Sequence, residues 1–222
     1  MSHNFPSELF TDIDFDFTPD KAEKLCTYNA LLHKWQKAIN LVSRHTLSDS
    51  WLRHFVDSAQ LAPLIRSYMN AASIKSPRLY DIGSGAGFPA LVLAMLCDEI
   101  DVHVIESDSK KCSFLRTVSR ETSTPLTIHN DRIEQVIFDG ADEDLLRCDI
   151  VSARALASLE DLLRYVKPIS NINPDLRLFL PKGQKSQEEI DSALNSYQFD
   201  YIRHESCVDT ESCILELYNL QL

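Results

Sequence analysis

The sequence holds no paired cysteine motif, no long apolar run and little glycine. Its 222 residues include five glycines and six cysteines, and the cysteines are scattered with no CxxC pair. This spacing argues against a metal cage or a disulfide framework and favours reduced thiols. No stretch approaches the roughly 18 consecutive apolar residues of a transmembrane helix, and the N-terminus lacks the basic start and apolar run of a signal peptide. We expect a cytoplasmic protein without membrane or metal partners.

Basic residues are in the minority. Lys and Arg number 22 against 33 Asp and Glu, which gives a formal net charge of −11. Residues 1–20 carry five of these acids and no Lys or Arg, so the rest of the chain stands at −6. Such acidity weighs against general affinity for phosphate backbones, but it does not exclude a local basic face. The 44% of hydrophobic and 25% of charged residues are typical of a globular domain.

The chain is expected to fall into three parts. The acidic segment 1–17 is predicted to be a flexible tail. Thr18 followed by Pro19 is typical of a helix start, and apolar residues then recur at helical spacing. This pattern predicts a helical cap over residues 18–76, with a second helix over about 48–68. From residue 77 to 222, strand-like runs alternate with helical stretches, which predicts a Rossmann-like α/β domain. Its last two runs, 199–206 and 212–220, predict an antiparallel hairpin at the edge of a mostly parallel sheet.

The most informative stretch is a glycine-rich turn after the first predicted strand of this domain. Residues 79–89 are LYDIGSGAGFP, in which Gly83 and Gly85 permit positive φ and close approach of a ligand to the backbone. A dinucleotide fingerprint, GxGxxG, would require glycine where the chain has Phe88. The spacing is GxGxG instead, the pattern of S-adenosyl-L-methionine-dependent methyltransferases. Another nucleotide, or a purely structural turn, remains open from these residues alone.

Acidic residues follow the next two predicted strands. Glu106 ends a strand-like run 23 residues after Gly83, where a carboxylate can accept hydrogen bonds from both hydroxyls of a ribose. The segment Asn130–Glu134 follows the third run, also at a carboxyl end. Ligands of open α/β sheets bind along that edge, so Asp131, or the backbone of Ile133 and Glu134, is a candidate adenine contact.

These residues belong to a longer pattern that resembles one family. Seven ordered stretches between about Leu31 and Lys185 are similar to the bacterial 16S ribosomal RNA guanine-N7 methyltransferases: LHKWQKAINLVS, RHFVDSAQLAP, YDIGSGAGFPALVLA, IESDSKKCSFLRTV, NDRIEQ, SARALASLEDLL and PKGQ. The resemblance implies a class-I methyltransferase fold, S-adenosyl-L-methionine as cofactor, and guanine 527 in the 530 loop of 16S RNA as target. Its partner would be 16S RNA or the 30S subunit, and we expect a monomer.

The resemblance also implies roles for particular residues. Gly83 and Phe88, with Gly85 between them, would line the cofactor site. Ile133 and Glu134 would hold its adenine, while Arg154 would reach the cofactor or the incoming guanine. Glu106 stands where the family usually has aspartate, so its side chain is one carbon longer. Candidate RNA contacts are Arg53, His54, Arg154 and Lys182.

Guanine N7 carries no proton, so its methylation requires alignment rather than a general base, and we assign no acid–base catalyst. Three other functions stay open. One is a class-I methyltransferase acting on a protein or small molecule, which the charge of −11 favours. Another is a non-catalytic assembly factor that binds the cofactor or RNA. A nicotinamide-dependent dehydrogenase is disfavoured by Phe88 in place of the third glycine.

Overall fold

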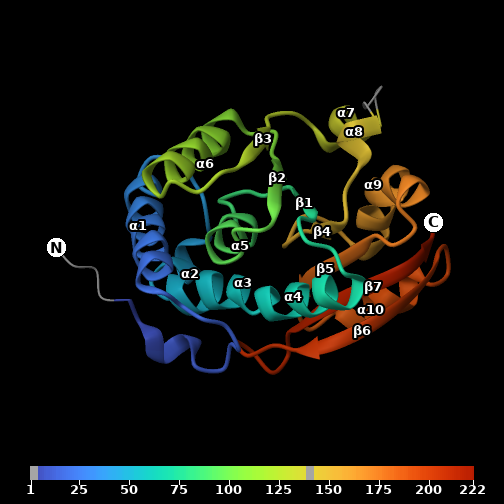
Figure 1. Cartoon of the computed structure of the whole chain (residues 1–222), viewed down its shortest axis with the longest axis horizontal. Coiled ribbons are helices and arrows are strands. Elements are labelled where there is room, and N and C mark those ends of the chain that lie inside the picture. The colour runs from blue at the N-terminus through green and yellow to red at the C-terminus, as the bar shows by residue number, and fades with distance from the viewer. Residues whose placement is uncertain (1–4, 139–142) are drawn as a thin grey trace.

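The computed structural model describes residues 5–138 and 143–222, and its centre is a seven-stranded sheet (Figure 1). The strand order is β3-β2-β1-β4-β5-β7-β6. Neighbouring strands from β3 through β5 pair in parallel, whereas β7 pairs antiparallel with β5 and with the edge strand β6. The predicted mostly parallel α/β sheet with an antiparallel hairpin at its edge is confirmed. The strands are β1 (Arg78–Ile82), β2 (Asp101–Ile105), β3 (Thr127–His129), β4 (Ile150–Ser152), β5 (Arg177–Lys182), β6 (Gln198–Glu205) and β7 (Cys213–Gln221).

Helices cover both faces of this sheet (Figure 1). Alternate residues of β1 point to opposite sides, so Leu79 joins the core with α1, α4, α5 and α6, while Tyr80 and Ile82 join the core with α7, α9 and α10. None of the helices in the described ranges is long and apolar enough to cross a membrane. The helices are η1 (Ser7–Phe10), α1 (Pro19–Trp35), α2 (Arg44–Leu47), η2 (Trp51–Val56), α3 (Asp57–Ala59), α4 (Leu61–Ala72), α5 (Ala90–Leu96), α6 (Ser109–Glu121), α7 (Ile133–Ile137), α8 (Glu143–Leu146), α9 (Leu159–Ile172) and α10 (Ser186–Ala193).

The helices that precede β1 share one core with the sheet. Thr18 caps α1, because its side chain accepts a hydrogen bond from the Lys21 backbone N–H. Leu25, Tyr28 and Leu32 on one face of α1 are fully buried in the cluster that also contains every residue of α5. The segment before the sheet is thus packed against the layer that supports the glycine turn.

The helix predicted over about 48–68 is interrupted in the structure. Its first part, η2, is a π-helix, and Gln60 separates the short α3 from α4. A π-turn is wider than an α-turn and is frequent at functional sites. Here it carries Arg53 and His54, which, with Asp57 just after it, line a cleft in the molecule.

The acidic N-terminal segment differs from the expected flexible tail wherever it is described. Residues 5–17 fold over η2, and Phe10 stacks on Phe5 and meets Trp51 edge to face. Phe10 and Ile13 are only 3% and 6% exposed. The expectation rested on the charge of the segment, which says nothing of the apolar residues between the acids. Burial of these apolar and aromatic side chains anchors the segment.

Candidate functional site

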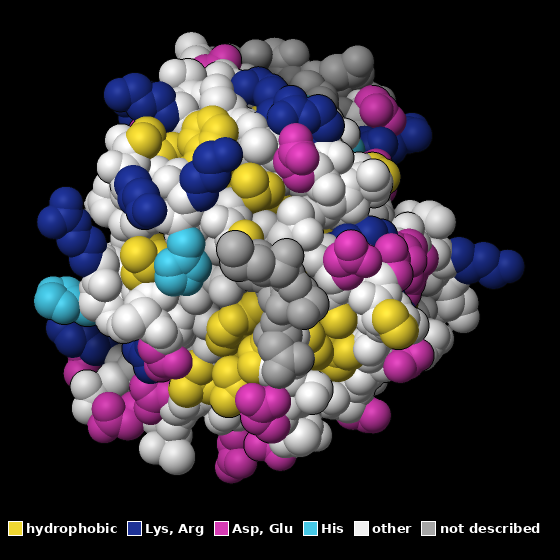
Figure 2. Space-filling model, turned by 90° about the vertical axis from the view of Figure 1, so that its left-hand side faces the viewer, with side chains coloured by type: hydrophobic (Ala, Val, Ile, Leu, Met, Phe, Trp, Pro, Cys, Tyr) yellow, Lys and Arg dark blue, Asp and Glu magenta, His cyan; other side chains and the backbone are white. Residues whose placement is uncertain are grey.

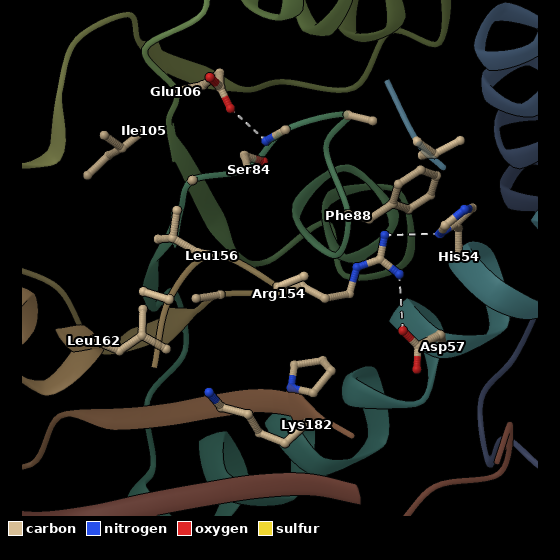
Figure 3. Close-up of a pocket in the computed structure, with 18 of the residues that line it drawn as sticks. His54, Asp57, Ser84, Phe88, Ile105, Glu106, Arg154, Leu156, Leu162 and Lys182 are labelled. Atoms are coloured by element: carbon tan, nitrogen blue, oxygen red, sulfur yellow. Dashed lines mark hydrogen bonds and ion pairs between the residues drawn. The ribbon is translucent and has the colours of Figure 1, made fainter. Parts of the chain in front are cut away.

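The candidate site is a cleft of about 840 Å³ at the carboxyl ends of the parallel strands. Strand order reverses between β1 and β4, and such a switch point is where open α/β sheets bind ligands. The turns after β1, β2, β3 and β4 form one side of the cleft, and residues 41–57 form another. Figure 3 shows side chains from both sides converging on this space.

The glycine turn presents backbone to the cleft. Gly83 and Gly85 both have positive φ, +67° and +59°. A Cβ on Gly83 would lie 2.4 Å from Leu156 Cδ1, whereas a Cβ on Gly85 would meet nothing closer than 3.9 Å. Gly83 is therefore required by both its conformation and close packing, while Gly85 leaves open space in which a ligand can approach the backbone.

Glu106 is held rigidly against this turn. Its Oε2 accepts a 2.8 Å hydrogen bond from the Gly85 backbone N–H (Figure 3). Its Oε1 accepts one of 2.8 Å from the Asp108 N–H. The residue is 7% exposed and follows β2 directly. The longer side chain thus folds back onto the backbone and still lines the cleft, with lone pairs left to accept from a ligand.

Two polar groups lie buried beneath the turn. Burial raises the pKa of Asp81 to about 6, against the opposing effect of the Ser84 and Ser152 hydroxyls. Ser152 Oγ donates to Asp81 Oδ1 at 2.7 Å. Within the described residues, Ser84 Oγ and Asp81 Oδ2 make no hydrogen bond of good geometry, and Ser84 lines the cleft. Sequence analysis assigned no role to either residue.

Arg154, just after β4, is fixed by the segment before the sheet. One guanidinium nitrogen lies 3.1 Å from Asp57 Oδ2 and donates to the Arg53 carbonyl oxygen at 3.1 Å, and the other donates to His54 Nδ1 at 3.1 Å (Figure 3). The guanidinium also lies over the Phe88 ring, 5.1 Å from its centroid. Four contacts therefore hold the cation at the cleft wall.

His54 is neutral and its tautomer is determined by its neighbours. Burial, together with the positive charges of Arg154 and Arg53, lowers the pKa of His54 to about 3. Since a guanidinium can only donate, Nδ1 must accept, and Nε2 carries the proton toward Thr46 Oγ1 at 2.9 Å. Both ring nitrogens are engaged, so His54 is not available as a base.

Phe88 is a wall of the cleft that is itself enclosed. It is 3% exposed, and its ring stacks between Tyr28, at 4.9 Å, and His54, at 5.1 Å. The Tyr28 hydroxyl in turn donates to the Ala86 carbonyl of the glycine turn. This stack joins α1, η2 and the glycine turn, and nothing in the local sequence around Phe88 indicates it.

The remaining predicted residues lie around the same cleft in different settings. Ile133 and Glu134 line it at the start of α7. Lys182 lines it as well, but its Nζ lies 2.7 Å from Glu189 Oε2 and its side chain is 9% exposed. Arg53 is more open, at 45% side-chain exposure, and pairs with Asp209 at 3.6 Å. The structure thus brings every predicted site residue to one cleft while engaging Lys182 in an internal ion pair.

Asp57 is a further functional candidate that sequence analysis missed. It lies three residues after His54, a spacing that places both on one side of a helix, and that spacing was the available signal. Among the described residues, no group of three or more His, Cys, Asp or Glu is placed to hold a metal ion.

Comparison with known proteins identifies the family. The model of the family described as GidB, rRNA small subunit methyltransferase G, matches residues 21–217. The chain belongs to this family. A ribosomal RNA small subunit methyltransferase G from Paramagnetospirillum magneticum is 42% identical over 212 residues, covering 96% of this chain and 94% of the relative. One from Sinorhizobium medicae is 39% identical over 206 residues, with 90% of each chain covered.

Solved structures of other methyltransferases share the fold. A magnesium protoporphyrin IX methyltransferase from Synechocystis, solved with bound S-adenosyl-L-methionine, aligns with a TM-score of 0.57 at 14% identity, covering 92% of this chain and 98% of that one. A ribosomal protein L11 methylase from Lactobacillus delbrueckii aligns with a TM-score of 0.52 at 18% identity over 72% and 77% of the two chains. The predicted class-I methyltransferase fold is confirmed.

Proposed function

We propose that this chain transfers a methyl group from S-adenosyl-L-methionine to N7 of guanine 527, in the 530 loop of 16S ribosomal RNA. Membership of the small-subunit methyltransferase G family gives the substrate class and the cofactor. The observation in the molecule that carries the proposal is the cleft at the strand-order reversal, where Gly85, Glu106 and Arg154 converge.

The residues present fit this cofactor. A volume of about 840 Å³ suits a ligand of its size, since small-molecule sites span roughly 300–1,000 Å³. The open space beside Gly85 allows backbone contact, and Glu106 offers acceptors for the ribose hydroxyls. The buried Ser84 hydroxyl, which makes no good hydrogen bond in the described residues, is available to a polar group of the ligand. Ile133 and Glu134 would border the adenine.

The chemistry needs little from the side chains beyond position. When bound, the cofactor supplies an activated methyl group on a sulfonium. Guanine N7 is an acceptor with a free lone pair, so no proton must be removed before attack. His54 has both ring nitrogens engaged and Asp57 is paired with Arg154, so neither is free to act as a base. The proposed task of the cleft is to align the reactants and exclude water.

Arg154 is the proposed positioning group for the guanine. Its guanidinium is fixed by Asp57, the Arg53 carbonyl and His54, so little conformational freedom remains to be lost when substrate arrives.

Several finer features belong to the same proposal. The working form is a monomer that acts on the 30S particle in the cytoplasm, and residues 18–76 serve as a helical cap on a methyltransferase domain over 77–222. Arg53 and His54 lie on the cap side of the cleft, where RNA would enter. Lys182 would contact RNA only if its ion pair with Glu189 opened.

The test is methyl transfer with labelled cofactor to 30S subunits that lack this modification. N7-methylguanine is mapped by reduction and aniline cleavage of the RNA. We expect one new cleavage in the 530 loop, with deproteinised 16S RNA as a parallel substrate. Cofactor binding measured by calorimetry without any transfer to RNA would reject the RNA substrate and keep the fold. Absence of cofactor binding would reject the methyltransferase proposal.

A further inference from the structure

Positive charge is concentrated in two short segments of this acidic chain. Residues 33–45 and 107–120 together contain seven Lys and Arg against one Asp, a formal charge of +6. The rest of the chain has 15 Lys and Arg against 32 Asp and Glu, a formal charge of −17. The two segments are therefore strongly basic although the whole chain has a net charge of −11.

The fold joins these two segments. The first lies at the end of α1 and the start of α2, and the second forms α6. Trp35 of α1 packs edge to face against Phe114 of α6, with ring centroids 5.7 Å apart. Figure 2 views this side of the molecule and shows Lys and Arg gathered over its upper part, where α6 lies in Figure 1, and Asp and Glu along its lower edge. Segments about 70 residues apart in sequence thus form one basic surface.

The charges on this surface are available to a partner. Six of its residues are at least partly exposed and have no ion pair with any residue in the described ranges. Asp108 is the one acid in the two segments. Its carboxylate caps α6 by accepting hydrogen bonds from the Lys110 and Lys111 backbone N–H groups. We call these six residues the basic strip: Lys34, Lys37, Arg44, Lys110, Lys111 and Arg116.

The strip reaches the mouth of the cleft. Ser43, beside Arg44, lines the cleft, and so does Lys111 at the start of α6. A chain bound along the strip would therefore continue into the cavity that holds Gly85 and Arg154. This continuity connects the surface to the reaction proposed above.

The rim formed by β5–α10 and the β6–β7 turn has the opposite character. Lys182 is neutralised there by Glu189, and Asp209 of the turn pairs with Arg53 of η2. Lys185 is exposed, and neither it nor Arg203 has an ion pair in the described ranges. Glu211 adds a further negative charge near Gln184. Phosphates approaching this rim would meet acidic groups and fewer unpaired cations than on the basic strip, so the two sides of the cleft attract RNA unequally.

We infer that the basic strip binds the phosphate backbone of the ribosomal RNA that flanks the target base, so that the RNA enters the cleft across α2 and α6. This inference rests on the proposed function and adds the direction of approach and the residues that hold the substrate. Lys and Arg contacts with phosphates supply affinity and orientation without reading sequence. They also explain how a chain of net charge −11 engages RNA.

The test compares matched double charge reversals. K37E/R44E and K110E/R116E each alter the strip, and K75E/K167E makes the same charge change at two exposed residues that do not line the cleft. Binding of a 530-loop RNA fragment is measured between 50 and 200 mM salt, together with kcat/KM on 30S subunits. Calorimetry with the cofactor and thermal melting confirm that each variant is folded.

Each phosphate contact contributes about 0.7 for a single strand, and about 0.9 for B-DNA, to the slope of log affinity against log salt. Loss of two contacts should lower the slope by about 1.4–1.8, so the wild type should lose about 7- to 12-fold more affinity than a strip variant across this salt range. The control should retain the wild-type slope. Equal effects of strip and control variants would overturn the inference and leave the proposed function intact. The same conclusion would follow if RNA binding were lost only when the charges of the opposite rim were reversed. A wild type that binds the cofactor but transfers no methyl group to 30S subunits would overturn both.

Discussion

Replacing Asp57 by asparagine removes the carboxylate that pairs with Arg154 while keeping the shape of the side chain. The two side chains are each 18% exposed and lie 3.1 Å apart. In D57N, the guanidinium retains the Arg53 carbonyl and His54 Nδ1 as acceptors and the Phe88 ring beneath it. The substitution therefore loosens one contact of Arg154 rather than releasing it.

The expected cost follows from two opposing terms. At this distance the attraction is about 5 kcal/mol for an effective dielectric constant of about 20. Burial raises the pKa of Asp57, since it disfavours the ionised carboxylate, and D57N relieves that penalty. We expect the free energy of unfolding to fall by about 2–3 kcal/mol, near the lower end for removing one partner of a buried pair. Displacement of Arg154 should also lower kcat/KM on 30S subunits by about 100-fold.

Urea unfolding and methyl transfer are measured for D57N, R154Q and the double variant. Glu121→Gln is the control, because Glu121 pairs with Arg120 at the surface, where side-chain exposures are 48% and 72%, and its loss should cost less than about 1 kcal/mol. If Asp57 acts through Arg154, the two losses should not add, and the double variant should resemble R154Q. Losses that add to within about 0.5 kcal/mol would refute the inference that Asp57 acts by holding Arg154.

Two further changes test the site. The pKa of His54 is lowered to about 3 in the folded state, so the folded protein keeps this side chain neutral as the pH falls below 7. In the unfolded chain the same histidine gains a proton below about pH 6.5. The stability that neutral His54 confers is therefore present at pH 7 and is lost as the pH falls. Between pH 7 and 5 the wild type should lose about 2 kcal/mol more than H54Q in urea unfolding, and identical pH profiles would contradict this. In Glu106→Gln, the amide oxygen can accept from only one of the Gly85 and Asp108 N–H groups, and the other faces an NH2 donor. We expect cofactor affinity to fall about 10- to 100-fold by calorimetry, with kcat at saturation largely retained. Unchanged affinity would exclude Glu106 from the ribose site.

Much of the fold could be predicted because its signals are local. The alternation of strand-like and helical runs follows from side-chain periodicity, and the Thr18–Pro19 start of α1 from capping of free N–H groups. The helix expected over about 48–68 was predicted too simply, since apolar spacing does not distinguish the π-turn of η2 from an α-helix. The acidic N-terminal residues were judged by charge, although their aromatic neighbours decided their packing.

The glycine spacing and Glu106 likewise indicated the cofactor site from sequence, because a strand–turn–helix places its own ligands. The setting of Arg154 was decided only by tertiary structure. Its partner Asp57 is 97 residues earlier, and no local pattern relates a residue after β4 to one after η2. The same holds for the basic strip, whose two segments become one surface only where α1 packs on α6. Sequence determined which elements form and what their turns can bind, whereas long-range packing determined which charges are paired and which remain available to RNA.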